Sequence, residues 1–444
     1  MMAPSTAELR TVEAEREAAV CRSSKLAQPV SGLRADLYVR GGLVLTCVSR
    51  GGDLIGRIPD GAIAIAGDQI VAVGTRTEVE RSVDLTAAEC VDAQGCVVAP
   101  GFVDSHTHLV FGGSRVQEYA ARMTHTAAEV RGMGIPSGIL ATVSMTRAAS
   151  MDELFESARA RLDGMFWSGT TTVEAKSGYG LNTAEELRML EVGRMLDRAG
   201  PIDVINTFLG AHDFPPDTPR ERYIDSILDE MIPEVAARGL AEFCDVYLDD
   251  GYYTVAESRR ILARAHDAGM RLKVHTDAYS DIGGAFLAAE MGVVSADHLN
   301  YTTPPAARAL ASRGVIGVVM PALDWAVAHK RPFDARMLMA EGVTLALATD
   351  LCPGCWAESM QFVMQLACRL YRFSPEEALL AATTGGARSL GLADRGTIAV
   401  GQVADLQIWR LPTFEDVMYR LGNNAVERMI KRGRVVARDQ RRFS

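Results

Sequence analysis

The stretch CVVAPGFVDSHTH, residues 96–108, determines how the rest of the chain is interpreted. Its first four residues, 96–99, are apolar and rich in valine, which predicts a buried strand. His106 and His108 follow at positions i and i+2, and such positions point to the same face of an extended chain. Two imidazoles on one face can bind one metal ion, although two neighbouring loop histidines would give the same pattern. The ends of the later strands decide between these interpretations.

After this stretch the pattern predicts alternating strands and helices. Capping boxes mark helix starts at Ser150, Thr183, Thr254 and Ser374. Short apolar runs that end in polar residues lie at 170–176, 204–212, 241–249, 271–275, 294–298, 315–321 and 345–350. Together with the first strand, these runs give eight βα units, which predict a TIM barrel whose chemistry lies at the C-terminal ends of its strands.

Both ends of the chain flank this barrel with short predicted strands. Several lie within residues 36–97, separated by glycine-rich turns, and two more lie at 401–409 and 429–436. Because each end supplies only a few strands, we expect both to combine into one small β-sandwich. Residues 1–35 are predicted to be an N-terminal extension that is poorly ordered or helical. The first sandwich part is predicted at 36–97, the barrel at 98–398 and the second sandwich part at 399–444.

The composition excludes several classes of protein. The net charge is −10 and no basic cluster is long enough to indicate a nucleic-acid partner. No apolar run reaches the roughly 18 residues that a membrane span needs. The first 35 residues contain no apolar segment typical of a secretory signal, and the eight cysteines are too scattered for a disulfide framework. We therefore expect a globular protein of the cytoplasm.

Polar side chains follow the first, fifth and eighth predicted barrel strands. These strands would bring His106, His108, His275 and Asp350 together. Three imidazoles and one carboxylate are suitable ligands for zinc or another divalent transition metal, which would acidify a bound water. Asp350 could also accept the proton of that water. His298, at the end of the sixth strand, could orient the water or stabilise a tetrahedral oxyanion.

Several motifs in the same order give the sequence a family resemblance. They are residues 101–108, 109–115, 174–181, 207–212, 295–299, 348–350, 401–406 and 419–424. In this set the chain resembles the metal-dependent amidohydrolase superfamily and, within it, the imidazolonepropionase family. The likeness spans about residues 36–436.

The resemblance implies hydrolysis of the ring amide of 4-imidazolone-5-propanoate to N-formimidoyl-L-glutamate, a step of histidine degradation. It implies one divalent ion per chain, zinc or iron, and we expect a homodimer. Arg115, Tyr179 and His212 would contact the substrate, with Cys352 and Gly354 beside them. The planar guanidinium of Arg115 suits the propionate of this substrate. The substrate is thus a small molecule with a carboxylate.

Two positions depart from the family pattern. Ala278 stands where the family usually has a carboxylate or amide, and Cys352 stands where it commonly has an asparagine. Both changes affect groups that recognise the ring, so a related hydrolase or deaminase acting on a different ring is the alternative. A non-catalytic scaffold would be expected to lose metal ligands, which this chain keeps. The pair Cys352 and Cys355 resembles a redox motif, but lining the pocket is the favoured role.

Overall fold

The computed structural model of the protein describes residues 32–436, which form two compact units. One unit takes the chain up to Gly101 and again from Asp394, and the other is formed by Phe102–Ala393. The predicted boundaries at residues 98 and 398 lie a few residues from these points. Most of the predicted N-terminal extension, residues 1–31, lies outside the described residues.

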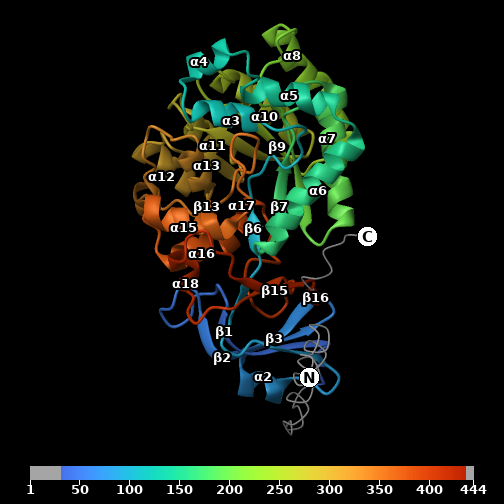
Figure 1. The fold of residues 1–444 in the computed structure, drawn as a ribbon, viewed down its shortest axis with the longest axis vertical. Coiled ribbons are helices and arrows are strands. Elements are labelled where there is room, and N and C mark those ends of the chain that lie inside the picture. Colours follow the sequence, from blue (N-terminus) through green and yellow to red (C-terminus); the bar gives the residue numbers. More distant parts are fainter. Residues whose placement is uncertain (1–31, 437–444) are drawn as a thin grey trace, which may run out of the picture. The chain divides into compact units, whose positions relative to one another are not determined.

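The larger unit is a barrel of eight parallel strands, each paired with the next along the chain (Figure 1). The strands are β6 (Phe102–Asp104), β7 (Thr170–Lys176), β8 (Asp203–Ala211), β9 (Phe243–Leu248), β10 (Arg271–Thr276), β11 (Ser295–His298), β12 (Ile316–Val319) and β13 (Leu345–Leu347). The first and last strands meet just beyond their ends, where Asp350 N donates to His106 O at 3.1 Å and His108 N donates to Leu351 O at 2.9 Å. The predicted TIM barrel is therefore confirmed, and two predicted ligand segments close it.

One strand of the prediction is wrong. Residues 96–99 were expected to open the barrel, but β5 (Val97–Pro100) pairs with strands of the smaller unit. The chain changes sheets at Gly101, whose N–H donates to Asp405 O, while the next N–H, of Phe102, donates to Gly169 O. The first barrel strand, β6, is thus only three residues long. An apolar run predicts a buried strand, but it does not show which of two sheets the strand joins.

Helices connect the barrel strands and also follow the last of them. They are α3 (Val116–Arg122), α4 (Ala127–Gly132), α5 (Gly138–Ala148), α6 (Met151–Trp167), α7 (Thr183–Ala199), α8 (Arg220–Ser226), the π-helix η1 (Ile227–Met231), α9 (Ile232–Ala237), α10 (Val255–Asp267), α11 (Gly284–Met291), α12 (Pro304–Ser312), α13 (Pro321–Ala326), α14 (Ala335–Ala340), α15 (Met360–Leu370), α16 (Pro375–Leu380), the π-helix η2 (Ala381–Gly385) and α17 (Gly386–Ser389). No helix within residues 32–436 is long and apolar enough to cross a membrane.

The predicted capping boxes formed at three of four helix starts. The side chains of Ser150, Thr254 and Ser374 each cap their helix reciprocally with a glutamate three residues on. At α7 the prediction is wrong by one residue, because Asn182 is the N-cap and its side chain accepts from Glu185 N. Asn caps a helix as well as Thr does, so the two neighbouring residues competed for one position.

The smaller unit is one mixed sheet to which both ends of the chain contribute strands, in the order β16-β15-β14-β5-β1-β2-β3, with β4 beside β1. Its elements are β1 (Leu37–Leu45), β2 (Arg57–Ala66), β3 (Gln69–Thr75), α2 (Arg76–Ser82), β4 (Glu89–Asp92), β5, β14 (Leu406–Trp409), α18 (Asp416–Tyr419), β15 (Val426–Lys431) and β16 (Arg434–Val436). Alternating residues of β1 enter separate apolar clusters, Leu37 and Val39 in one and Tyr38 in the other. Both faces of the sheet are therefore covered.

Candidate metal centre and substrate pocket

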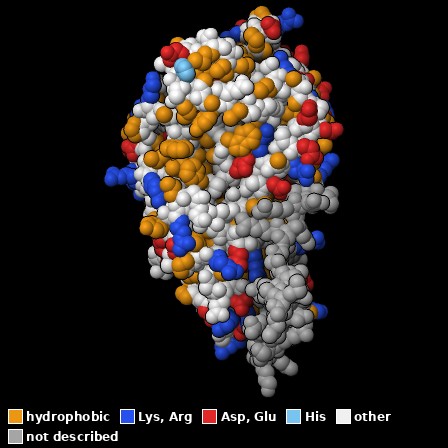
Figure 2. Space-filling view, in the orientation of Figure 1, with side chains coloured by type: hydrophobic (Ala, Val, Ile, Leu, Met, Phe, Trp, Pro, Cys, Tyr) orange, Lys and Arg blue, Asp and Glu red, His pale blue; other side chains and the backbone are white. Residues whose placement is uncertain are grey.

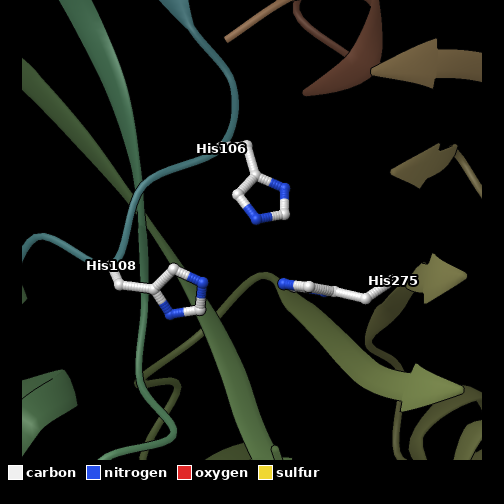
Figure 3. Close-up of side chains that lie close together, drawn as sticks. All are labelled: His106, His108 and His275. Atoms are coloured by element: carbon white, nitrogen blue, oxygen red, sulfur yellow. The ribbon is translucent and has the colours of Figure 1, made fainter. Parts of the chain in front are cut away.

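The four predicted metal ligands lie together at the C-terminal end of the barrel. His106 and His108 follow β6, His275 lies in β10, and Asp350 follows β13. Figure 3 shows the three imidazoles converging on one point. Asp350 Oδ1 lies 3.8 Å from Nε2 of His106 and 3.7 Å from Nε2 of His108. Ligands that share one ion at about 2.1 Å lie roughly 3 to 4 Å from each other, so this spacing fits a single ion.

The ligand atoms themselves indicate that an ion belongs here. Nε2 of His106 and Nε2 of His275 are buried and have no hydrogen-bond partner. Leaving a buried polar atom unpaired costs about 1–3 kcal/mol, and a bound cation would remove that cost. Burial also lowers the pKa of His106 and His108 well below the usual value, so both rings are neutral. Neutral imidazole is the form that binds metal ions.

Two buried carboxylates lie beside the outer nitrogens of two of these rings. Asp297 Oδ2 lies 2.7 Å from Nδ1 of His106, and Asp245 Oδ2 lies 2.8 Å from Nδ1 of His275. Each carboxylate favours the tautomer with the proton on Nδ1, which leaves Nε2 free for an ion. These two residues were not predicted from the sequence. Their signal was weak, because an aspartate inside an apolar run can equally be a capping or core residue.

His298 and Asp350 stand beside the three imidazoles in a strained backbone. Their φ angles are +83° and +49°, in the left-handed region that residues other than glycine seldom adopt. The His298 ring centroid lies 5.4 Å from that of His106 and 5.2 Å from that of His275. Burial raises the pKa of Asp350 to about 6, although His275 and Lys176 oppose this rise. A carboxylate with such a pKa can take up and release a proton near neutral pH.

A cavity of about 670 Å³ opens above these residues. The predicted substrate contacts Arg115, Tyr179, His212, Cys352 and Gly354 all line it, together with His108, His275, His298 and Asp350. A pocket of this volume can enclose a small organic molecule and exclude much of the water around it. The structure thus brings the predicted substrate residues and the metal ligands to one cavity, with His106 buried beneath.

His212 and Tyr179 form one wall of the cavity. The His212 ring stacks on that of His108, with centroids 4.8 Å apart, and its Nδ1 donates to Gly178 O at 3.0 Å. Burial lowers the pKa of His212 to about 3, so the ring is neutral and Nε2 remains an acceptor. A side chain at Gly178 would lie 2.9 Å from His212 Nδ1, which explains the glycine there. Tyr179 is buried and its pKa is raised by burial, so its hydroxyl stays protonated.

Arg115 lies at the side of the cavity and is held by a neighbouring carboxylate. Its Nε and Nη2 donate to the two oxygens of Glu118, at 2.5 and 3.1 Å. Arg122 also contacts Glu118, at 2.8 Å. Glu118 therefore fixes the plane of the Arg115 guanidinium and leaves Nη1, which faces Gly354, for another partner. The two guanidinium groups outnumber the single carboxylate, so this side of the cavity keeps a positive charge.

The two departures from the family pattern lie in different parts of the site, because Cys352 lies near Gly354 and Arg115 whereas Ala278 follows β10. Ala278 is buried and presents no side-chain polar group, while its carbonyl accepts from Nε2 of His329 at 2.9 Å. The Tyr279 and His329 rings lie 5.2 Å apart at the same edge of the cavity. His329 was not predicted to belong to the site. A single histidine outside any recognised motif carried no signal that it would turn back to this strand end.

Cys352 and Cys355 face each other across a tight turn, with hydrogen bonds of 3.0 Å in both directions between their backbones. Both thiols are free. Burial raises the pKa of both, which makes the reactive thiolate scarce. Only Cys352 lines the cavity. These contacts favour the pocket-lining role for Cys352.

The outer rim of the cavity is less enclosed than its floor. The first helix after β6, α3, leaves Val116 and Tyr119 more than 60% exposed, and Met123 follows at 58%. Figure 2 shows hydrophobic side chains between charged ones over the part of the barrel unit that carries α3 and α5. The floor is built by strand ends, whereas this rim is built by short helices and loops.

Comparison with known proteins gives the chain a family. The Amidohydrolase family profile matches residues 97–436. Imidazolonepropionase of Symbiobacterium thermophilum is 45% identical over 386 residues, which cover 85% of this chain and 90% of that protein. Imidazolonepropionase of Alkaliphilus metalliredigens is 41% identical over 384 residues, with the same shares covered.

Solved structures show the same fold at lower identity. An adenosine deaminase from Xanthomonas campestris, crystallised with bound zinc, superposes with a TM-score of 0.70 at 20% identity, over 91% of this chain and 93% of that one. This likeness supports the architecture alone. The relatives that are more than 40% identical cover most of both chains. The chain therefore belongs to the amidohydrolase family and, within it, to the imidazolonepropionases.

Proposed function

We propose that this protein hydrolyses the ring amide of 4-imidazolone-5-propanoate to N-formimidoyl-L-glutamate, with one divalent ion, zinc or iron, held by His106, His108, His275 and Asp350. The observation that carries this proposal is the convergence of unpartnered imidazole nitrogens and Asp350 on the floor of a cavity that Arg115 borders. We further propose that the enzyme works as a homodimer in the cytoplasm.

The reaction adds water to the ring carbonyl carbon and breaks its bond to the ring nitrogen. The ion supplies Lewis-acid chemistry, by lowering the pKa of water and polarising the carbonyl. Asp350 accepts the proton of the attacking water and returns it to the leaving nitrogen. His298, neutral and buried beside Asp350, donates an N–H to the oxyanion that develops on the carbonyl oxygen. The carbonyl carbon becomes a carboxylate of the product.

The remaining cavity residues orient the substrate. Arg115 binds the propionate through the guanidinium nitrogens that Glu118 leaves available. Tyr179 donates its hydroxyl to an acceptor of the substrate, and Nε2 of His212 accepts from a ring N–H. Cys352 and Gly354 close the side of the cavity next to Arg115. Holding both ends of the substrate brings the carbonyl to the metal centre in one orientation.

A second candidate is hydrolysis or deamination of a different ring. Ala278 and Cys352 favour it, because neither provides the carboxylate or amide that a ring with two N–H groups would use. An unpaired N–H in a dry pocket costs about 1–3 kcal/mol. The hydroxyl groups of Tyr279 and other tyrosines at the rim can provide acceptors instead. We therefore keep imidazolonepropanoate as the first candidate.

The test is turnover of 4-imidazolone-5-propanoate beside two matched compounds, with the products identified by mass spectrometry. One compound has the same ring without the propionate, and the other has the propionate on a different cyclic amide. We expect brisk hydrolysis of 4-imidazolone-5-propanoate itself, with kcat above roughly 1 s⁻¹. We expect the ring without propionate to react poorly. Faster turnover of the other cyclic amide would favour the second candidate.

A further inference from the structure

A single buried ammonium group joins the two carboxylates that hold the metal-binding histidines. Lys176 Nζ donates to Asp245 Oδ2 at 2.7 Å and lies 3.4 Å from Asp297 Oδ2. These are the same two oxygens that face Nδ1 of His275 and Nδ1 of His106. The contacts form one continuous chain from ring to ring. Lys176 is its middle member.

The surroundings of Lys176 leave it little freedom. Its side chain is fully buried, and Nζ also donates to Glu174 Oε1 at 3.0 Å. Glu174 is itself held by the hydroxyl of Thr207 and by Nζ of a second buried lysine, Lys273, at 2.8 Å. A fully buried ammonium with several carboxylate partners is fixed in place, because any other position would leave charges unpaired.

Lys273 provides an internal comparison. It is as deeply buried as Lys176 and shares Glu174 as a partner, and its other hydrogen bond is to Ser105 O at 3.1 Å. Within residues 32–436, no hydrogen bond or ion pair joins Lys273 to Asp245 or Asp297. The charge of Lys273 also acts on Asp297, so the two lysines differ in direct contact: only Lys176 of the pair lies within 3.4 Å of both carboxylates behind the histidines.

We propose that Lys176 is a positioning residue of the metal centre: it clamps Asp245 and Asp297 against His275 and His106 and so sets the direction in which both rings present Nε2. This inference rests on the proposed metal centre. Without the ammonium, the link that ties the two carboxylates to each other is lost. The affinity for the ion then falls because two of four ligands are less well oriented.

The experiment compares Lys176→Met with the matched control Lys273→Met. Both variants remove one buried ammonium and leave an unbranched side chain that is one atom shorter. Metal-free protein is titrated with zinc against a chromogenic chelator, and the visible spectrum of bound cobalt reports the ligand geometry. We expect the dissociation constant for zinc to rise about 10- to 100-fold in Lys176→Met, the range for lost outer partners of metal ligands. In Lys273→Met we expect the dissociation constant for zinc to rise less than about threefold.

Thermal unfolding of the metal-free variants separates positioning from general damage. Both variants should be destabilised to a similar degree, while the cobalt spectrum should change only in Lys176→Met. Equal losses of zinc affinity in the two variants, or no loss in Lys176→Met, would overturn the inference. If Lys176→Met does not yield folded protein, Lys176→Gln is measured in its place, with the same two outcomes. A wild-type protein that binds no zinc, iron or cobalt would instead overturn the proposed metal centre itself.

Discussion

The floor and the rim of the cavity are built in different ways. On the floor, each of His106 and His275 is backed by a buried carboxylate, and those carboxylates share one ammonium. At the rim, Arg115 is supported by Glu118, but Ala278 offers no side-chain polar group. The proposed metal centre is thus held by buried contacts, while the residues proposed to recognise the ring lie on loops. Changes on the floor should therefore affect the reaction itself, and changes at the rim should affect which substrate reacts.

The largest effect is expected for Asp350→Ala, because Asp350 is proposed to be both a ligand and the proton acceptor. Activity should fall by about 10³-fold or more, and most of the bound metal should be lost. Metal analysis and steady-state kinetics measure both effects. Asp249→Asn is the control, since it alters a buried carboxylate after β9 that holds Tyr279 N at 2.8 Å. It should keep the metal. Full metal and full activity in Asp350→Ala would exclude both roles of Asp350.

The next effect concerns Arg115 at the rim. Lysine keeps the charge but not the planar fork, so Arg115→Lys should lose about 2–4 kcal/mol of transition-state binding, seen mainly in kcat/KM. Arg122→Lys is the matched control, because Arg122 also contacts Glu118 but is about half exposed. Its effect should be small. Metal content should not change in either variant. Unchanged kinetics of Arg115→Lys on the propionate substrate would place Arg115 outside the binding mode.

A smaller effect is expected from restoring the family pattern with Ala278→Glu and Cys352→Asn together. If tyrosines and water at the rim already accept hydrogen bonds from the ring N–H groups, the double change should bring no gain. Turnover of imidazolonepropanoate should then stay within about tenfold of the wild-type value or fall below it. A clear gain over a nearly inactive wild type would show that the natural ring is different. The measurement is kcat/KM for the propionate substrate and for a second cyclic amide, in both proteins.

The smallest effect is a pH-dependent loss of stability in Glu118→Gln. Burial acts to raise the pKa of Glu118, but its hydrogen bond with Arg115 and the charges of Arg115 and Arg122 lower it below the usual value. A lowered pKa in the folded protein means that this contribution is present above the unfolded pKa and disappears as pH falls through the folded pKa. The variant should be less stable by about 1–3 kcal/mol at pH 7. Chemical unfolding should show that the difference in unfolding free energy between wild type and Glu118→Gln is smaller near pH 3 than at pH 7. An equal difference at both pH values would contradict a lowered pKa for Glu118.

Much of the floor was predictable because its signals are local. His106, His108, His275 and Asp350 each end an apolar run, and in a parallel barrel such ends meet at one face. The carboxylates behind them were not predictable in this way. Asp245 and Asp297 lie within strands, and only the barrel geometry shows that they face the outer nitrogens of the rings.

The first barrel strand and the rim illustrate the other limits of the sequence. The run 96–99 is as apolar as any barrel strand, but pairing across the whole chain places β5 in the smaller sheet. His329 reaches Ala278 O across 51 residues of chain, and no periodicity marks such a contact. Loops are positioned by these long-range contacts rather than by local patterns, so the rim could be recognised only from its resemblance to a family.

The measurement that tests the central claim most directly is a titration of metal-free protein with zinc or iron while turnover of 4-imidazolone-5-propanoate is followed. Activity should be absent without the ion, rise in proportion to the ion bound, and level off at about one ion per chain, with kcat above roughly 1 s⁻¹. Turnover that persists without any ion, or a fully loaded protein that leaves this substrate intact, would contradict the account.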